Sequence, residues 1–261
     1  MPSFTASDGA AIHYEADADD GRPALVLSNS LGTNLGMWEP QLAAARAHFR
    51  VVRYDSRGHG GSAAPAGPYT IARLGRDAVE LLDALGLAKA SFCGLSKGGM
   101  VGMWLGANAA SRLERLALCN TAAHLPPAEL WSGRIETALT KGMSALADAV
   151  VERWFTPPFR ERDPQTVDRV RAMILATPPI GYAGCCAAIR DMDQRADLAG
   201  IAVPTLVVAG EKDPATPPAM GEAVAAAIPA ATFTVLPDCA HLSNLEQPAA
   251  FNAAVFGFLA A

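Results

Sequence analysis

The sequence predicts an α/β fold: a mostly parallel, eight-stranded sheet flanked by helices, with an inserted helical cap. Short apolar runs alternate with helical patterns over residues 1–121, which is typical of parallel strands joined by right-handed crossovers. The alternation stops over residues 122–196, where helical segments separated by prolines contain no convincing strand. It resumes over residues 197–261. We therefore assign 1–121 and 197–261 to one core and 122–196 to a helical cap.

Eight segments have the composition of strands. The first two flank Asp8-Gly9, a dipeptide that predicts a hairpin turn between two edge strands. The others are mainly continuous apolar runs, as expected of strands that are buried on both faces of a parallel sheet. The predicted strands cover residues 4–7, 11–15, 24–28, 50–54, 91–93, 113–119, 205–209 and 232–236.

Helical periodicity accounts for the segments between the strands. Leu74, Ala78, Leu81 and Leu85 fall on one face of a helix predicted over residues 71–85. The other predicted core helices cover residues 38–47, 97–110 and 248–259. The predicted cap helices cover residues 128–139, 143–154, 164–175 and 182–193.

Composition and charge exclude several classes of protein. Hydrophobic residues make up 51% of the 261 residues and charged residues 18%, which supports a large core and argues against disorder. The net charge of -5 and the absence of a Lys/Arg run argue against nucleic acid or an anionic membrane as the main partner. The sequence leaves open whether the protein forms a homo-oligomer.

The N-terminal segment and the cysteines indicate the compartment. The first residues have no basic segment followed by an apolar one, so we read no signal peptide, and no apolar run reaches transmembrane length. The five cysteines lie mostly in apolar surroundings and form no C-x-x-C pattern. We expect buried free thiols in a reducing cytoplasm.

The pentapeptide Gly94-Leu95-Ser96-Lys97-Gly98 lies between a predicted strand and a predicted helix. It matches G-x-S-x-G, the pattern of a nucleophilic serine on a sharp strand-to-helix turn. Glycines allow the close backbone packing of such a turn, and the helix behind it directs N–H groups toward Ser96. The pattern arises by chance in about one chain in ten of this length. It therefore indicates a nucleophile only if a base, an acid and an oxyanion hole are found elsewhere in the chain.

A serine nucleophile needs a base and an orienting acid. Of five histidines, His241 is favoured because it follows the last strand, at the carboxyl edge where sites of open α/β sheets form. Asp213 follows the preceding strand, which gives the chain order Ser, Asp, His. Asp238 and Glu211 are nearby substitutes that we interpret as solvated loop carboxylates.

Two backbone N–H groups are expected to form the oxyanion hole: that of Lys97 and that of Leu31, in the loop after the strand over residues 24–28. Ser30 or Asn29 could position this loop or contact the substrate. The Lys97 side chain has two interpretations. Either it extends to solvent beside the site, or it attracts an anionic substrate.

Two further groups of residues were considered as binding sites. Trp131 and Arg134 are three apart in a predicted cap helix, so they share a face on which an aromatic ring and a guanidinium would suit a small carboxylate. The alternative is a surface arginine over a packed tryptophan. Asp55, Arg57 and His59 match no metal-ligand spacing, so we interpret them as a structural loop and expect no metal.

With these residues in place, the chain resembles the α/β-hydrolase superfamily along nearly its whole length, and more specifically bacterial 3-oxoadipate enol-lactonases. The stretches that carry this resemblance are residues 27–38, 55–62, 94–98, 106–109, 118–123, 177–191, 210–213 and 241–248. The resemblance implies an α/β-hydrolase fold and hydrolysis of a small anionic lactone, 3-oxoadipate enol-lactone, to 3-oxoadipate in the β-ketoadipate pathway. It implies no cofactor and no metal. Lys97 departs from the pattern, since similar enzymes usually carry an apolar residue there.

Our hypothesis is a serine hydrolase in which Ser96 attacks the lactone carbonyl while His241, oriented by Asp213, accepts its proton. A route in which His241 activates water directly is an alternative to the covalent one. A general carboxylesterase or perhydrolase on the same scaffold is a second functional hypothesis. A non-catalytic ligand-binding homologue is a third, which the presence of all three residues disfavours.

Overall fold

The computed structural model describes residues 2–261, which form one eight-stranded sheet with the order β1-β2-β4-β3-β5-β6-β7-β8. Strand β2 runs antiparallel to β1 and β4, and all other neighbours are parallel. This confirms the predicted fold class. The strands are β1 (Ser3–Thr5), β2 (Ala11–Ala16), β3 (Ala24–Ser28), β4 (Arg50–Tyr54), β5 (Ala90–Leu95), β6 (Leu113–Cys119), β7 (Thr205–Gly210) and β8 (Thr232–Leu236).

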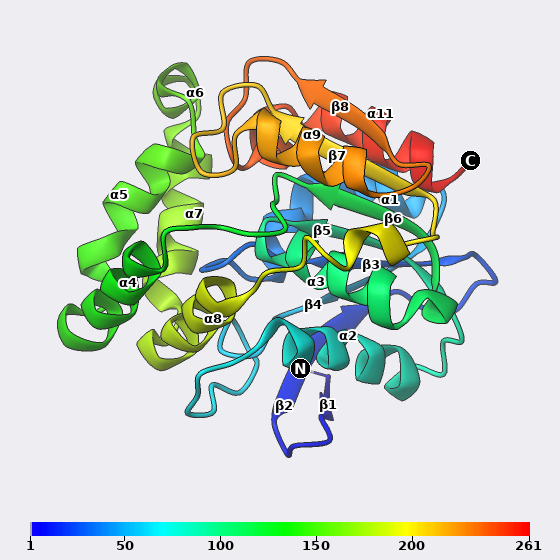
Figure 1. The fold of residues 1–261 in the computed structure, drawn as a ribbon, viewed down its shortest axis with the longest axis horizontal. Helices are drawn as coiled ribbons and strands as arrows, with labels where there is room; N and C mark the ends of the chain where they lie inside the picture. Colours follow the sequence, from blue (N-terminus) through cyan, green and yellow to red (C-terminus); the bar gives the residue numbers. More distant parts are fainter. Residues whose placement is uncertain (1) are drawn as a thin grey trace.

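Helices cover both faces of the sheet. In Figure 1, α2 (Ile71–Ala84), α3 (Lys97–Asn108) and α9 (Pro218–Ala227) lie in front, while α1 (Leu42–Arg46) and α11 (Pro248–Leu259) lie behind. The helices between β6 and β7 gather beyond one end of the sheet as the cap. They are α4 (Ala128–Lys141), α5 (Ser144–Trp154), α6 (Pro157–Arg162), α7 (Pro164–Ala176) and α8 (Pro179–Asp191).

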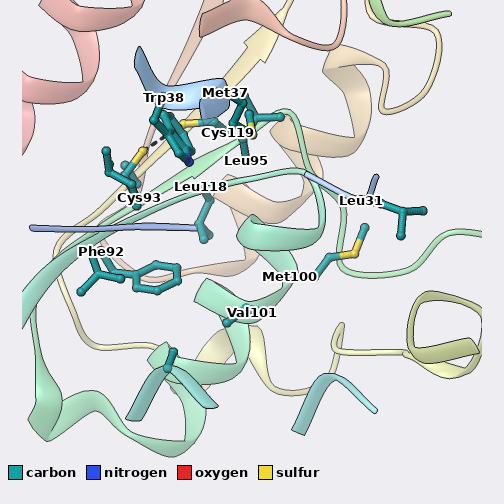
Figure 2. Packing of buried hydrophobic residues seen from close by; sticks show 14 of the residues in the cluster. Leu31, Met37, Trp38, Phe92, Cys93, Leu95, Met100, Val101, Leu118 and Cys119 are labelled. Atoms are coloured by element: carbon teal, nitrogen blue, oxygen red, sulfur yellow. Dashed lines mark hydrogen bonds between the residues drawn. The ribbon is translucent and has the colours of Figure 1, made fainter. Parts of the chain in front are cut away.

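The core is built around strands that are apolar on both faces. Every residue of β3, β5 and β7 is buried, as expected for central parallel strands. In Figure 2, Trp38 and Met37 lie over Cys93, Leu95 and Cys119 near the ends of β5 and β6. All five cysteines are buried and free, which confirms that prediction.

Three of the longer helical segments differ from the prediction: α6 and α9 were not predicted, and one predicted helix has another form. The helix predicted over residues 38–47 is a 3-10 helix, η1 (Leu35–Gln41), followed by the short α1. Pro40 lies inside η1 and has no N–H to donate to an α-helical ladder. Helix α6 was not predicted, because Pro157-Pro158 reads as a helix breaker. Proline is tolerated in the first helical turn, and the Thr156 side chain caps this helix.

Three short helical segments complete the chain: η2 (Ala110–Arg112), η3 (Leu198–Gly200) and α10 (Ser243–Glu246). Among residues 2–261, no single helix is long and apolar enough to cross a membrane. Helices α7 and α8 reach that length and composition only as a pair, and they are bent by 96° relative to each other.

Candidate active site

Ser96 lies on the turn between β5 and α3 with φ 58° and ψ −115°. A non-glycine residue with positive φ is held in place only by its surroundings. Three hydrogen bonds hold it. The Ser96 N–H donates to the Cys119 carbonyl at 2.8 Å, and the Ser96 carbonyl accepts from Thr121 Oγ1 at 2.8 Å and from the Met100 N–H at 3.0 Å. The serine is therefore presented at the carboxyl end of β5 in a strained but well-supported conformation.

The two glycines of the pentapeptide are required by close packing. A Cβ atom on Gly94 would lie 2.1 Å from the Gly98 carbonyl oxygen, and one on Gly98 would lie 2.2 Å from the Ser28 carbonyl oxygen. Both obstacles are backbone atoms, which cannot move aside as a flexible side chain can. The G-x-S-x-G spacing thus follows from how tightly α3 packs behind the turn.

His241 and Asp213 form a buried pair at the carboxyl edge of the sheet. His241 Nδ1 lies 2.8 Å from Asp213 Oδ2, and both side chains are almost fully buried. Asp213 follows β7 and His241 follows β8, so the parallel order of these strands brings the two loops together. The arrangement can orient the imidazole and leave Nε2 for proton transfer.

Asp213 accepts more hydrogen bonds than the one from His241. Asn120 Nδ2 donates to Oδ2 at 3.0 Å, and Thr216 Oγ1 donates to the same oxygen at 2.7 Å. Oδ1 accepts from the N–H groups of Ala215 and Thr216, at 2.8 and 3.1 Å. Burial alone would raise the pKa of Asp213, but His241 and these donors outweigh burial and lower it. The carboxylate is therefore held in its ionised form.

Ser96 and His241 line one pocket between the cap and the core. Leu31 and Thr216 reach it from the core, whereas Asp213 stays behind His241. Trp154 covers the imidazole, with 5.8 Å between the ring centroids. The remaining lining residues are Met100, Leu125, Pro126, Leu130, Trp131, Arg134, Val150, Arg153, Ile189 and Ala215.

Two cap arginines line this pocket. The Arg134 guanidinium lies 4.9 Å from the centre of the Trp131 ring, as the shared helical face predicts. Arg153 comes from α5, and burial together with the nearby charge of Arg134 lowers its pKa. No carboxylate within residues 2–261 forms a salt bridge with either guanidinium. Two like charges without an acidic partner in one pocket can bind an anion.

The backbone around Ser96 offers two N–H groups for an oxyanion. Across residues 2–261 no hydrogen bond uses the N–H of Leu31 or that of Lys97. Leu31 lines the pocket, and Lys97 is the first residue of α3. Figure 2 shows Leu31 on its loop beside Met100 of α3, the helix that begins directly behind Ser96. These two groups have the chemistry of an oxyanion hole.

The structure places Ser30 and the Lys97 side chain elsewhere than expected. Ser30 is fully buried and does not belong to the pocket lining. Lys97 is also fully buried, so its side chain does not extend to solvent, and it does not line the pocket. The interpretation in which the Lys97 side chain extends to solvent is therefore wrong, because this side chain is fully buried. Attraction of an anionic substrate by its charge stays a prediction, and any such attraction acts without contact with the pocket.

Four residues at or behind the site were missed from the sequence: Asn120, Arg153, Thr216 and Glu246. Thr216 follows Asp213 by three residues, a spacing at which a hydroxyl can bond a nearby carboxylate. This spacing could have identified Thr216 from the sequence. Asn120, Arg153 and Glu246 contact partners that are distant in the sequence, as Asn120 contacts Asp213, and no local pattern identifies them.

Comparison with known proteins shows the family of this chain. The α/β hydrolase fold family profile matches residues 23–248. The chain is similar to 3-oxoadipate enol-lactonase 2 of Acinetobacter baylyi, with 42% identity covering 97% of this chain and 94% of that protein. The same organism's 3-oxoadipate enol-lactonase 1 is 38% identical, covering 98% and 96%.

Solved structures extend the similarity to three dimensions. The enol-lactonase from Burkholderia xenovorans LB400 superimposes on this chain with a TM-score of 0.97 and 48% identity, and each chain is covered completely. Because the coverage is complete, the similarity includes the cap as well as the core.

Proposed function

The chain belongs to the α/β-hydrolase family and is a carboxylic ester or lactone hydrolase, and on this premise we propose that it hydrolyses 3-oxoadipate enol-lactone. The two relatives at 42% and 38% identity are named 3-oxoadipate enol-lactonases. The single observation that favours an anionic lactone over a neutral ester is the pair of cap arginines, Arg134 and Arg153, in the pocket of Ser96.

In the proposed mechanism Ser96 attacks the ring carbonyl and His241 accepts the hydroxyl proton. Asp213, kept ionised by its donors, stabilises the imidazolium that results. The Leu31 and Lys97 N–H groups stabilise the oxyanion. Collapse of the intermediate breaks the ring C–O bond and leaves an enolate within the acyl-enzyme. The enolate takes the proton from the His241 imidazolium and tautomerises to a ketone, which returns His241 to its neutral form. Water activated by His241 then hydrolyses the acyl-enzyme, giving 3-oxoadipate.

The cap supplies recognition in this proposal. The carboxymethyl arm of the lactone pairs with Arg134 or Arg153, while the Trp131 ring supports the Arg134 guanidinium. The carboxylate of this arm carries the only charge of the substrate, so binding energy from this contact orients the ring carbonyl toward Ser96. A neutral ester of similar size lacks the contact.

Substrate kinetics test the assignment. We expect Arg134→Gln and Arg153→Gln to raise KM for the carboxylated lactone by about tenfold or more, and to change KM for a neutral p-nitrophenyl ester by less than about twofold. An equal loss on both substrates would contradict anion recognition. Faster turnover of neutral esters than of any carboxylated lactone would instead support a general esterase.

A separate experiment tests the nucleophile. Phosphonate ester labelling should modify Ser96, and Ser96→Ala should lower kcat by about 10³-fold or more. Near-wild-type turnover by Ser96→Ala, with no adduct on the wild-type enzyme, would favour direct attack by water that His241 activates.

A further inference from the structure

His59, in the loop after β4, is fully buried and uses both ring nitrogens. Nδ1 lies 3.2 Å from the Arg57 carbonyl oxygen, which can only accept, so Nδ1 carries the ring proton. Nε2 is then an acceptor, and the Gly32 N–H donates to it at 2.8 Å. The ring is therefore neutral, with its proton on Nδ1.

Gly32 directly follows Leu31, whose N–H is one of the two proposed oxyanion donors. The Ser30 carbonyl shares a peptide with that N–H and accepts from Thr33 Oγ1 at 3.0 Å. Because the C=O and N–H of a trans peptide point in opposite directions, this bond turns the Leu31 N–H away from Thr33. His59 fixes the next peptide, so two consecutive peptide planes of the loop are held.

The surroundings favour the neutral ring. Cys185 of α8 faces His59, with its sulfur 4.0 Å from Nδ1, and the charge of Lys97 of α3 acts on the ring. Burial, reinforced by the positive charge of Lys97, holds the pKa of His59 well below its usual value. Protonation would put a second proton on Nε2, facing the Gly32 N–H, and the bond to the loop would be lost.

This placement gives the buried Lys97 side chain a role. Its Nζ is buried and forms no hydrogen bond to any group of residues 2–261. Burial lowers the pKa of Lys97, although the charges of Cys185, Asp55 and Asp77 oppose this shift. Lys97 is also the residue whose N–H is the other proposed oxyanion donor.

We propose that His59 is a positioning residue for the oxyanion hole: it holds the Leu31–Gly32 segment through the Gly32 N–H. The inference rests on the proposed serine-hydrolase mechanism, since it assigns Leu31 an oxyanion role. His59 contacts no substrate. It acts on the transition state only, because it positions the Leu31 N–H, whose hydrogen bond to the substrate oxygen strengthens as the oxyanion forms.

Three variants test the positioning role. His59→Phe removes the acceptor and keeps a ring of similar size, whereas His59→Gln restores an oxygen acceptor near the Nε2 position. We expect His59→Phe to lower kcat by about 10- to 100-fold with KM nearly unchanged, and His59→Gln to recover most of that loss. His13→Phe is the matched control: His13 is also buried, but it bonds Asp55 at the start of the loop after β4, at 2.8 Å, and not the Leu31–Gly32 segment, so this variant should lower the melting temperature while kcat stays near wild type.

Three assays distinguish a failure of the His59 role from a failure of the proposed substrate assignment. Each variant is assayed with the lactone, with p-nitrophenyl acetate, and for its rate of inactivation by a fluorophosphonate. If the wild type does not hydrolyse the lactone, the proposed function fails while the other two readouts still test His59. Wild-type inactivation rates in folded His59→Phe, or a failure of His59→Gln to recover kcat, would overturn the positioning role.

Nitrogen NMR of the imidazole tests the electrostatic part. The wild-type His59 ring should show the neutral Nδ1–H tautomer at about pH 6, below which an ordinary histidine is mostly protonated. In Lys97→Met the ring should protonate at a higher pH than in the wild type. A protonated His59 in the wild type would overturn the whole arrangement, and an unchanged titration in Lys97→Met would overturn the role of Lys97.

Discussion

At the scale of single residues, the site is defined by how many donors converge on Asp213. Its two oxygens accept from His241, Asn120, Thr216 and the backbone. A carboxylate with so many donors has one stable orientation, and it presents that orientation to the His241 imidazole. Thr216 matters twice, because it bonds Asp213 and also lines the pocket.

Thr216→Val tests this network with a side chain of almost the same shape. The change removes the hydroxyl that donates to Asp213 at 2.7 Å, so we expect a loss of about 1.5–3 kcal/mol in unfolding free energy and a several-fold lower kcat. Urea unfolding and steady-state kinetics measure the two effects.

The pH dependence of this loss has a definite sign. Asp213 has a lowered pKa in the folded state, so the stability from its ionised form is present above its ordinary value of 3.8 and lost as the pH falls through the folded value. The difference between wild type and Thr216→Val should be full at about pH 7 and shrink in acid. A difference in unfolding free energy that is the same in acid as at about pH 7 would contradict the role of the Asp213 charge.

At the scale of elements, helix α8 joins the cap to the core by backbone contact. Gly181 in α8 lies against Gly58 in the loop after β4, so closely that a Cβ atom on Gly181 would lie 2.3 Å from the Gly58 carbonyl oxygen. The Tyr69 N–H also donates to the Gly184 carbonyl at 3.1 Å. The same loop carries His59, so the position of the cap and that of the oxyanion loop depend on one segment.

Gly181→Ala should separate these two backbones. Because the obstacle is a carbonyl rather than a side chain, we expect a loss of about 1–3 kcal/mol in stability and a lower kcat/KM. Gly133→Ala is the control in the same cap: no atom lies within 4 Å of its added Cβ, and alanine should stabilise helix α4 by about 0.5–1 kcal/mol. Equal melting temperatures for the two variants would show that the α8 contact carries little energy.

At the scale of the whole molecule, Glu246 ties the cap to the loop that carries His241. Its carboxylate accepts from Thr156 N and Oγ1 in the cap, at 3.0 and 2.8 Å, and from the Ala240 N–H in the core, at 3.1 Å. Burial raises the pKa of Glu246 above its ordinary value, although these donors oppose the shift. The stability that Glu246 contributes is therefore full below its ordinary value of 4.5 and declines as the pH rises through the folded value.

Glu246→Gln removes this titration. The amide cannot satisfy all three donors, so the variant should be less stable than the wild type at about pH 4, with a gap that narrows toward about pH 7. Denaturant unfolding across this range measures the gap. Glu161→Gln, at an exposed position on α6, provides the comparison, and a Glu246→Gln gap that stays constant with pH would refute the argument.

Much of the architecture follows from local pattern. The apolar runs of β3, β5 and β7 can be satisfied only inside a parallel sheet, and every residue in them is buried. Ser96 was selected by its G-x-S-x-G pattern, and Asp213 and His241 because the carboxyl ends of parallel strands meet at one edge. The proline-rich starts of α6 and α9 and the 3-10 turns of η1 were missed, since local proline signals do not distinguish a helix start from a helix stop.

The sequence by itself thus determined the fold class, the nucleophile candidate and its partners, because periodicity and strand order are properties of the chain alone. Only the tertiary structure decided the direction of the Lys97 side chain, the presence of Arg153 in the pocket, and the contacts of His59, Asn120 and Glu246. Each of these depends on which residues meet across long sequence separations, as Asn120 and Asp213 do. Packing of the whole molecule selects such neighbours, and no local pattern encodes them.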